Sequence, residues 1–301
     1  MKYYNEIKSK LIDNEVYKKV KDYSKNRNDL STYYEVGKLL IKAQGGEERA
    51  KYGDNLIKEY SERLFNDTGR KYNITALKRI RQFYLVVEKG VPLAHQLTWS
   101  HYCELLPLKD INEINYYIKT TIEQCLSKRQ LRERIRNKEY QRLDDKTKLK
   151  LINKEEIDIK DNIKNPIIIK NKLDIDKEIV SEKILQRLIL EDIPSFLEEL
   201  GTGYSFIKNE YKIKIGERYN YIDLLLFNIE YNCYVVIELK VTELKKEHIG
   251  QIQIYMNYID NSLRKITQDK TIGLIICKKD NKYVVEYSSD KRILSREYEL
   301  I

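Results

Sequence analysis

Two apolar runs in the last third of the chain are each interrupted by an acidic residue. The first run covers residues 221–227 and contains Asp223, and the second covers residues 233–240 and carries Glu238 followed two positions later by Lys240. Both runs are rich in aliphatic and aromatic residues, which favours β-strands. Because strand side chains alternate between faces, Glu238 and Lys240 are expected to project from the same face.

Charged groups in such apolar surroundings indicate a specific chemistry. Their burial is costly unless they pair or bind a metal. Two carboxylates that share a hard cation beside an amine suit metal-assisted hydrolysis of a phosphodiester. Asp223 and Glu238 are candidate ligands for Mg²⁺, with Mn²⁺ as an alternative, and the backbone carbonyl of Leu239 is a candidate third ligand. Lys240 could orient a water, stabilise developing charge or, if desolvation lowers its pKa, act as a general base.

A simpler interpretation treats Glu238 and Lys240 as an ordinary ion pair on an exposed strand face. Such pairs are common and contribute little to stability. The preceding residues 235–237 are Val-Val-Ile, however, which is typical of an interior strand, and Asp223 lies between two aliphatic residues. We therefore favour a buried catalytic group.

The composition is consistent with a nucleic-acid partner. The 301 residues are 42% hydrophobic, which allows two domains with real cores, and the net charge of +9 favours a polyanion. A solvated basic surface with no ligand is the alternative. The N-terminus lacks the apolar core of a signal peptide, and no apolar stretch is long enough to span a bilayer. We expect a cytoplasmic protein that binds DNA and no membrane, with RNA and a homodimer left open.

The pattern along the chain predicts three segments. Residues 1–143 have helical periodicity, residues 144–176 form a charged connector, and residues 177–301 mix helices and strands. In the first segment we expect helices near residues 33–41, 54–65, 74–87, 100–106, 110–119 and 127–136. In the last we expect helices at 182–200 and 246–260 and strands at 206–215, 221–229, 233–239, 271–277 and 283–287. This order implies a mixed sheet with helices packed against it.

The carboxylates, the lysine and the segments around them resemble the YhcG type of the PD-(D/E)XK nuclease superfamily. The segments that carry the resemblance are residues 96–102, 221–225, 233–240 and 250–258. The resemblance extends from about Asn14 to Tyr287. It implies a restriction-endonuclease-like α/β domain, with a mixed sheet flanked by helices, behind an all-α N-terminal domain. It also implies a metal-dependent DNA endonuclease that acts in recombination, repair or defence against foreign DNA.

Gln251 and Tyr255 lie one helical turn apart in the helix expected after the lysine strand. They resemble the QxxxY element of some PD-(D/E)XK nucleases and could reach a phosphate or orient the lysine. The alternative is a polar helix face with a partly packed tyrosine.

One position departs from the family pattern. Many members of the superfamily carry an acid on the first helix, and here that position falls on Gln186. An amide carbonyl can bind Mg²⁺, but without charge it binds the ion more weakly. Glu182, Glu191, Glu210 and Glu217 are candidate substitutes. The departure leaves open one metal or two, and it supports an alternative function as a nucleic-acid-binding or protein-binding adaptor with a degenerate nuclease fold.

The helical segment contains a candidate helix-turn-helix. Residues 54–65 and 73–84 would be its helices, with the turn at Gly69. The second helix carries Lys78, Arg79, Arg81 and Gln82, residue types that reach phosphates and base edges. An amphipathic helix with a solvated basic face is the alternative interpretation.

Overall fold

The computed structural model describes residues 3–19, 25–46, 53–69 and 72–301. The chain divides into two compact units, Met1–Tyr140 and Gln141–Ile301. Within the described residues, no helix combines the length and the apolar character needed to cross a bilayer.

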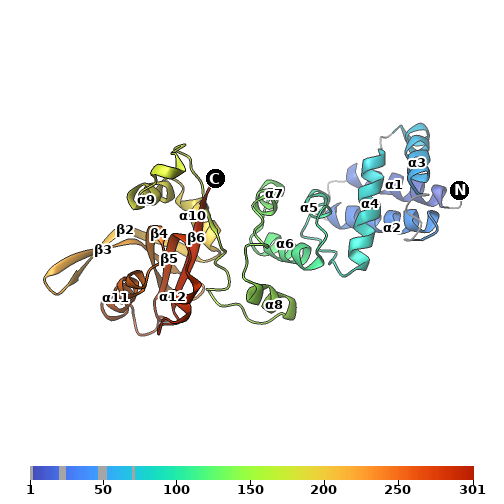
Figure 1. The fold of residues 1–301 in the computed structure, drawn as a ribbon. Coiled ribbons are helices and arrows are strands. Elements are labelled where there is room, and N and C mark those ends of the chain that lie inside the picture. The colour runs from blue at the N-terminus through green and yellow to red at the C-terminus, as the bar shows by residue number, and fades with distance from the viewer. Residues whose placement is uncertain (1–2, 20–24, 47–52, 70–71) are drawn as a thin grey trace. The chain divides into compact units, whose positions relative to one another are not determined.

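The described part of the first unit is helical (Figure 1). Its helices are α1 (Tyr4–Lys19), α2 (Lys25–Ala43), α3 (Gly53–Thr68), α4 (Ile74–Glu88), α5 (Trp99–Leu105), α6 (Ile111–Glu123) and α7 (Lys128–Arg136). α2 and α4 pack so closely that a Cβ on Gly37 would lie 2.5 Å from the carbonyl oxygen of Ile80. The Trp99 ring packs against Tyr33 and Phe83, with ring centroids 4.6 and 5.4 Å away. The lone tryptophan therefore belongs to the helical core.

The second unit is an α/β domain. Its elements are α8 (Asp145–Asn153), β1 (Ile167–Ile169), the 3₁₀ helix η2 (Lys177–Ile179), α9 (Glu182–Glu191), α10 (Ile193–Leu200), β2 (Tyr204–Ile215), β3 (Arg218–Asn228), β4 (Cys233–Glu243), α11 (Lys246–Ser262), β5 (Ile272–Lys279), α12 (Lys282–Glu286) and β6 (Ile293–Leu300). The strands form one sheet in the order β1-β6-β5-β4-β3-β2. β2, β3 and β4 are antiparallel, and β4, β5, β6 and β1 are parallel. The predicted mixed sheet is confirmed.

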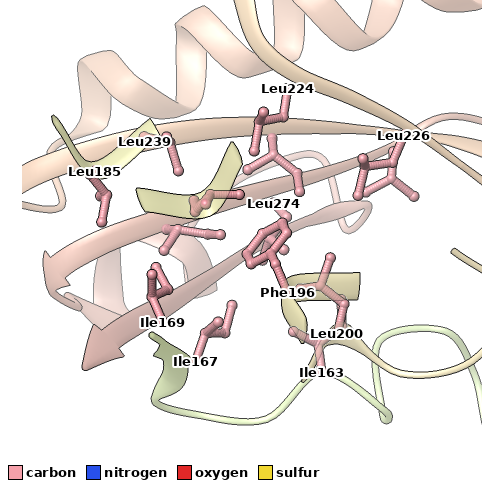
Figure 2. Close-up of a cluster of buried hydrophobic side chains, with 14 of the residues drawn as sticks. Ile163, Ile167, Ile169, Leu185, Phe196, Leu200, Leu224, Leu226, Leu239 and Leu274 are labelled. Atoms are coloured by element: carbon pink, nitrogen blue, oxygen red, sulfur yellow. The ribbon is translucent and has the colours of Figure 1, made fainter. Parts of the chain in front are cut away.

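Helices cover both faces of this sheet. On one face, residues of α9 and α10 such as Leu185 and Phe196 pack with Leu224, Leu239 and Leu274 of the central strands (Figure 2). On the other face, α11 packs its own apolar residues against the sheet. Successive side chains of β4 and β5 point to opposite faces and contribute to both cores. The sequences of these two strands are therefore nearly continuous apolar runs.

Two expected elements differ from the structure. The single helix expected at residues 182–200 is two helices, because Asp192 caps α10 and Pro194 occupies its first turn. The prediction of a strand at residues 283–287 is wrong, because residues 283–286 belong to the helix α12. Val284 and Val285 both pack against the cluster beneath α11, which one helical turn allows and a strand would not. The last strand is β6.

Residues 144–176, expected as a charged connector, contain α8 and β1. β1 pairs with β6, with Ile167 opposite Tyr298. Ile163 and Ile167 are buried in the same cluster as α9 and α10. Part of this lysine-rich segment therefore contributes to the core of the second unit.

Candidate active site

The paired strands β3 and β4 bring the two carboxylates together. Leu224 and Ile237 are the last paired residues at this end of the two strands, and Asp223 and Glu238 are the next residues beyond them. Glu238 is 2% exposed and Lys240 is 8% exposed. Glu238 and Lys240 are therefore buried groups and not a surface ion pair.

The two oxygens of the Glu238 carboxylate have different surroundings. Oε1 accepts a hydrogen bond from Lys240 Nζ at 2.9 Å and another from Gln251 Nε2 at 2.8 Å. The same Gln251 nitrogen lies 3.1 Å from the Tyr255 hydroxyl. Oε2 is buried and has no hydrogen-bond partner among the described residues. A buried carboxylate oxygen without a partner is costly, and it is the type of atom that a cation satisfies.

Asp223 is fixed through both its backbone and its side chain. Its Oδ2 accepts a hydrogen bond from the Leu239 N–H at 2.8 Å, and its backbone carbonyl accepts one from Gln186 Nε2 at 3.0 Å. Ile222 and Leu225 both pack beneath α11 although they are three residues apart, so the alternation of β3 is interrupted around Asp223.

The electrostatics of the site favour a bound cation. Burial, together with the neighbouring Asp223 carboxylate, raises the pKa of Glu238 to about 7. Burial also raises the pKa of Asp223. Burial alone would lower the pKa of Lys240, but the charge of Glu238 and the hydrogen bond to it outweigh burial, and the net pKa is raised. Lys240 is therefore an ammonium at neutral pH, and the general-base role that needs a lowered pKa is not favoured.

The first helix contributes both a glutamine and an acid. Gln186 lies on α9, and its side-chain amide positions the Asp223 backbone. Glu182, one turn earlier on the same helix, places Oε2 3.5 Å from Lys240 Nζ. The spacing of four residues between the two is the sequence signal that points to Glu182. Glu191 instead pairs with Arg187 at 3.8 Å.

The acids expected near the first strand have different positions. Glu210 is close enough for its charge to raise the pKa of Asp223, whereas Glu217 is exposed at the turn between β2 and β3. In the described part of the chain, no group of three or more His, Cys, Asp or Glu side chains is arranged to hold a metal. The centre therefore presents Asp223 and Glu238 as its two principal carboxylates.

The candidate recognition residues lie on α4, in the first unit. Lys78, Arg79 and Gln82 are exposed and Arg81 is half-buried. Arg81 Nε donates a hydrogen bond to Gln44 at 2.6 Å, and Gln82 donates one to the carbonyl of Leu106. α3 continues to Thr68, and residues 70 and 71 of the candidate turn lie outside the described residues. DNA binding by this helix stays a prediction.

Two family models match the chain, and their boundaries lie close to the boundary between the two compact units. Residues 160–301 match the family model of the YhcG PDDEXK nuclease domain, and residues 9–142 match that of the DUF1016 N-terminal domain. The two parts of the chain are thus similar to a YhcG-type PDDEXK nuclease domain and to its DUF1016 N-terminal partner domain. The Escherichia coli (strain K12) protein named "Putative nuclease YhcG" is 26% identical over 310 residues, which cover 90% of this chain and 83% of that protein. The resemblance seen in the sequence is confirmed.

Two solved structures are also similar to part of this chain. A repair endonuclease from Pyrococcus abyssi is 17% identical, with a TM-score of 0.28 over 40% of this chain and 47% of that one. A structure of EndoMS in complex with double-stranded DNA is 19% identical, with a TM-score of 0.29 over 40% of this chain and 44% of that one. This chain spans less than half the length of either.

Proposed function

We propose that this protein is a Mg²⁺-dependent DNA endonuclease whose centre is built from Asp223, Glu238 and Lys240. The observation that carries the proposal is the buried Oε2 of Glu238, which lacks a partner among the described residues. The Asp223 carboxylate is close enough for its charge to help raise the pKa of Glu238. A PDDEXK fold around these residues supports the assignment.

The residues fit a divalent cation. Asp223 and Glu238 would hold it with their carboxylates, and the carbonyl of Leu239 is the third candidate ligand. A hard cation prefers oxygen ligands, and its charge would relieve the repulsion that raises the pKa of Glu238. When bound, Mg²⁺ or Mn²⁺ supplies charge neutralisation and makes a bound water more acidic. Glu182, near Lys240, is a candidate further acid for a second ion.

The protein groups around the carboxylates have separate roles in this proposal. Lys240 is protonated and would donate to a phosphoryl oxygen as negative charge develops there. Gln251 donates a hydrogen bond to Oε1 of Glu238, which would hold the carboxylate so that its Oε2 keeps a fixed direction. Gln186 holds the backbone of Asp223. The proposal further includes binding of DNA by the helical unit and a role in recombination, repair or defence.

The proposal is tested by cleavage assays on the full chain. The wild type, Lys240→Ala and Glu238→Gln proteins would be incubated with linear, supercoiled and branched DNA and with RNA, in Mg²⁺ or in EDTA. Cleavage of DNA by the wild type alone, and only with metal, is expected. If the wild type binds DNA but leaves every substrate intact, the adaptor alternative takes its place. Cleavage of RNA but not DNA would contradict the substrate assignment.

A further inference from the structure

The strands β2 and β3 extend beyond the sheet as a two-stranded ribbon. β3 pairs with β4 only from Leu224 to Asn228, whereas its pairing with β2 continues to Arg218. Figure 1 shows this hairpin reaching past the other elements of its unit. We call residues 212–221 the arm. Isolated hairpins are marginally stable, so a projecting one needs support.

One face of the arm is supported by the domain. Ile213 is buried in the cluster beneath α11, and so is Ile222, the residue that follows the arm. The side chains that alternate with them project from the opposite face. The outer residues of the arm, 214–219, are all exposed. The arm therefore has one anchored face and one open face.

The open face carries lysines and tyrosines. Lys212 is paired with Tyr221, and Lys214 with Tyr219. The ammonium of Lys212 lies 3.8 Å from the centre of the Tyr219 ring, which confirms that these side chains share a face. Tyr219 is 57% exposed and Tyr221 is 51% exposed. Large aromatic groups exposed on a projecting strand indicate a contact surface.

The charge of the arm complements a polyanion. Its charged residues are Lys212, Lys214 and Arg218, against the single acid Glu217. The arm also leads along β3 towards the candidate active site, because Asp223 follows Tyr221 by two residues on the same strand. At about 3.3 Å per residue, Tyr219 lies about 13 Å along the strand from Asp223. A ligand on the arm would thus reach the active site.

We propose that the arm lies in the major groove of duplex DNA and positions the duplex at the active site. The inference deepens the proposed function and rests on it for the identity of the ligand. A two-stranded β-ribbon fits the major groove, which is about 12 Å wide. The lysines and Arg218 would contact phosphates on the groove walls, while the tyrosines would contact base edges and sugars.

A binding experiment tests the arm separately from catalysis. Anisotropy of a labelled DNA duplex would be measured in EDTA, so that cleavage does not contribute, between about 50 and 200 mM salt. The arm variant is Lys212→Gln, Lys214→Gln and Arg218→Gln combined. The control variant is Lys265→Gln, Lys270→Gln and Lys291→Gln, which removes the same charge from exposed positions at the other end of the parallel strands.

The arm variant should bind the duplex about tenfold or more weakly than the wild type. Its salt dependence should also be shallower by about two to three in the slope of log K against log salt, since each phosphate contact contributes about 0.9. The control variant should keep the wild-type slope. Equal slopes in the arm and control variants, or no binding of duplex by the wild type, would overturn the proposal.

Two further measurements make the outcome specific. If a single strand of the same length binds as tightly as the duplex and depends equally on the arm, the groove model is overturned in favour of stacking on single strands. Tyr219→Ala with Tyr221→Ala should weaken duplex binding while the salt slope stays unchanged, and an unchanged affinity would count against the groove contact.

A wild type that binds duplex through the arm but cleaves nothing refutes the nuclease alone. A wild type that cleaves with metal, and whose arm variant binds and cleaves equally well, refutes the arm alone.

Discussion

Glu238 Oε1 accepts a hydrogen bond from the Lys240 ammonium, 2.9 Å away. The other carboxylate oxygen, Oε2, is buried without a partner among the described residues. The lysine therefore partly compensates the charge of the buried carboxylate at Oε1. In the proposed function, Oε2 is the oxygen that remains for a cation. Four predictions follow from this centre and from the helical packing.

Glu238 should make the metal-free protein less stable as pH rises. Its pKa is about 7 in the folded protein against an ordinary value of 4.5, so folding disfavours the charged form. The free energy of unfolding begins to fall as pH rises past the pKa of Glu238 in the unfolded chain. The fall is complete above its pKa in the folded protein and amounts to about 3 kcal/mol. Urea unfolding in EDTA from pH 4 to pH 8 would measure it as the difference between the wild type and Glu238→Gln. Adding Mg²⁺ at pH 8 should restore stability in the wild type only. A difference that stays constant with pH would contradict the assignment.

Lys240→Ala should reduce the single-turnover rate of DNA cleavage by about 100-fold or more, because it removes a positive charge beside the reacting phosphate. Lys240→Arg should restore activity only in part, since the guanidinium is larger and planar. Lys279→Ala serves as the control, because this lysine on β5 is exposed and 4.0 Å from its nearest acid, Glu243. Equal loss in both alanine variants would point to a general effect of charge.

Glu182→Gln should raise the Mg²⁺ concentration needed for half-maximal cleavage, because it removes a carboxylate whose oxygen lies 3.5 Å from Lys240 Nζ. Gln186→Glu should lower the required Mg²⁺ concentration only if the new carboxylate turns away from the Asp223 carbonyl and towards the ion. Glu191→Gln, on the same helix, should leave the Mg²⁺ dependence as it is. A metal titration of the cleavage rate distinguishes the three variants, and an unchanged Glu182→Gln curve would remove this acid from the site.

Gly37→Ala should destabilise the helical unit by about 1–3 kcal/mol, because the new methyl group would overlap the Ile80 carbonyl oxygen on α4. Trp99 fluorescence reports on this unit, since the only tryptophan of the chain packs in its core. Gly250→Ala on α11 is the matched control. Apart from its chain neighbours and the backbone of its own helix, no atom of the described residues lies within 4 Å of the new Cβ, so circular dichroism should show equal or greater stability. A neutral Gly37→Ala would mean that α2 and α4 can separate slightly.

The sheet was predictable from the sequence because apolar alternation and buried acids mark its central strands. Residues 221–227 and 233–240 form the adjacent strands that the pattern indicates. The pattern could not separate α12 from a strand, because five residues with two adjacent valines satisfy both periodicities. It also could not show the interruption at Asp192, which depends on a cap and a proline within an otherwise continuous apolar period.

The grouping of Asp223, Glu238 and Lys240 in the candidate site was predictable from the sequence, but the electrostatics of these residues were less so. Asp223, Glu238 and Lys240 come together because β3 and β4 are neighbours, which spacing suggests. The direction of the Lys240 pKa depends on a balance between burial and a carboxylate at 2.9 Å, and only the three-dimensional arrangement gives that balance. The same holds for Glu182, whose distance to the lysine depends on how α9 packs against the sheet.

The pairing of β1 with β6 has a consequence for how the second unit can be separated from the rest of the chain. β1 covers the outer edge of β6, and the preceding residues bring Ile163 into the core. A fragment that began at residue 177 would lose this strand and expose a row of unpaired backbone groups along β6. Such an open edge recruits strands from other molecules, so the shorter fragment should self-associate. The solubility of the excised second unit therefore depends on residues that the sequence pattern assigns to a linker.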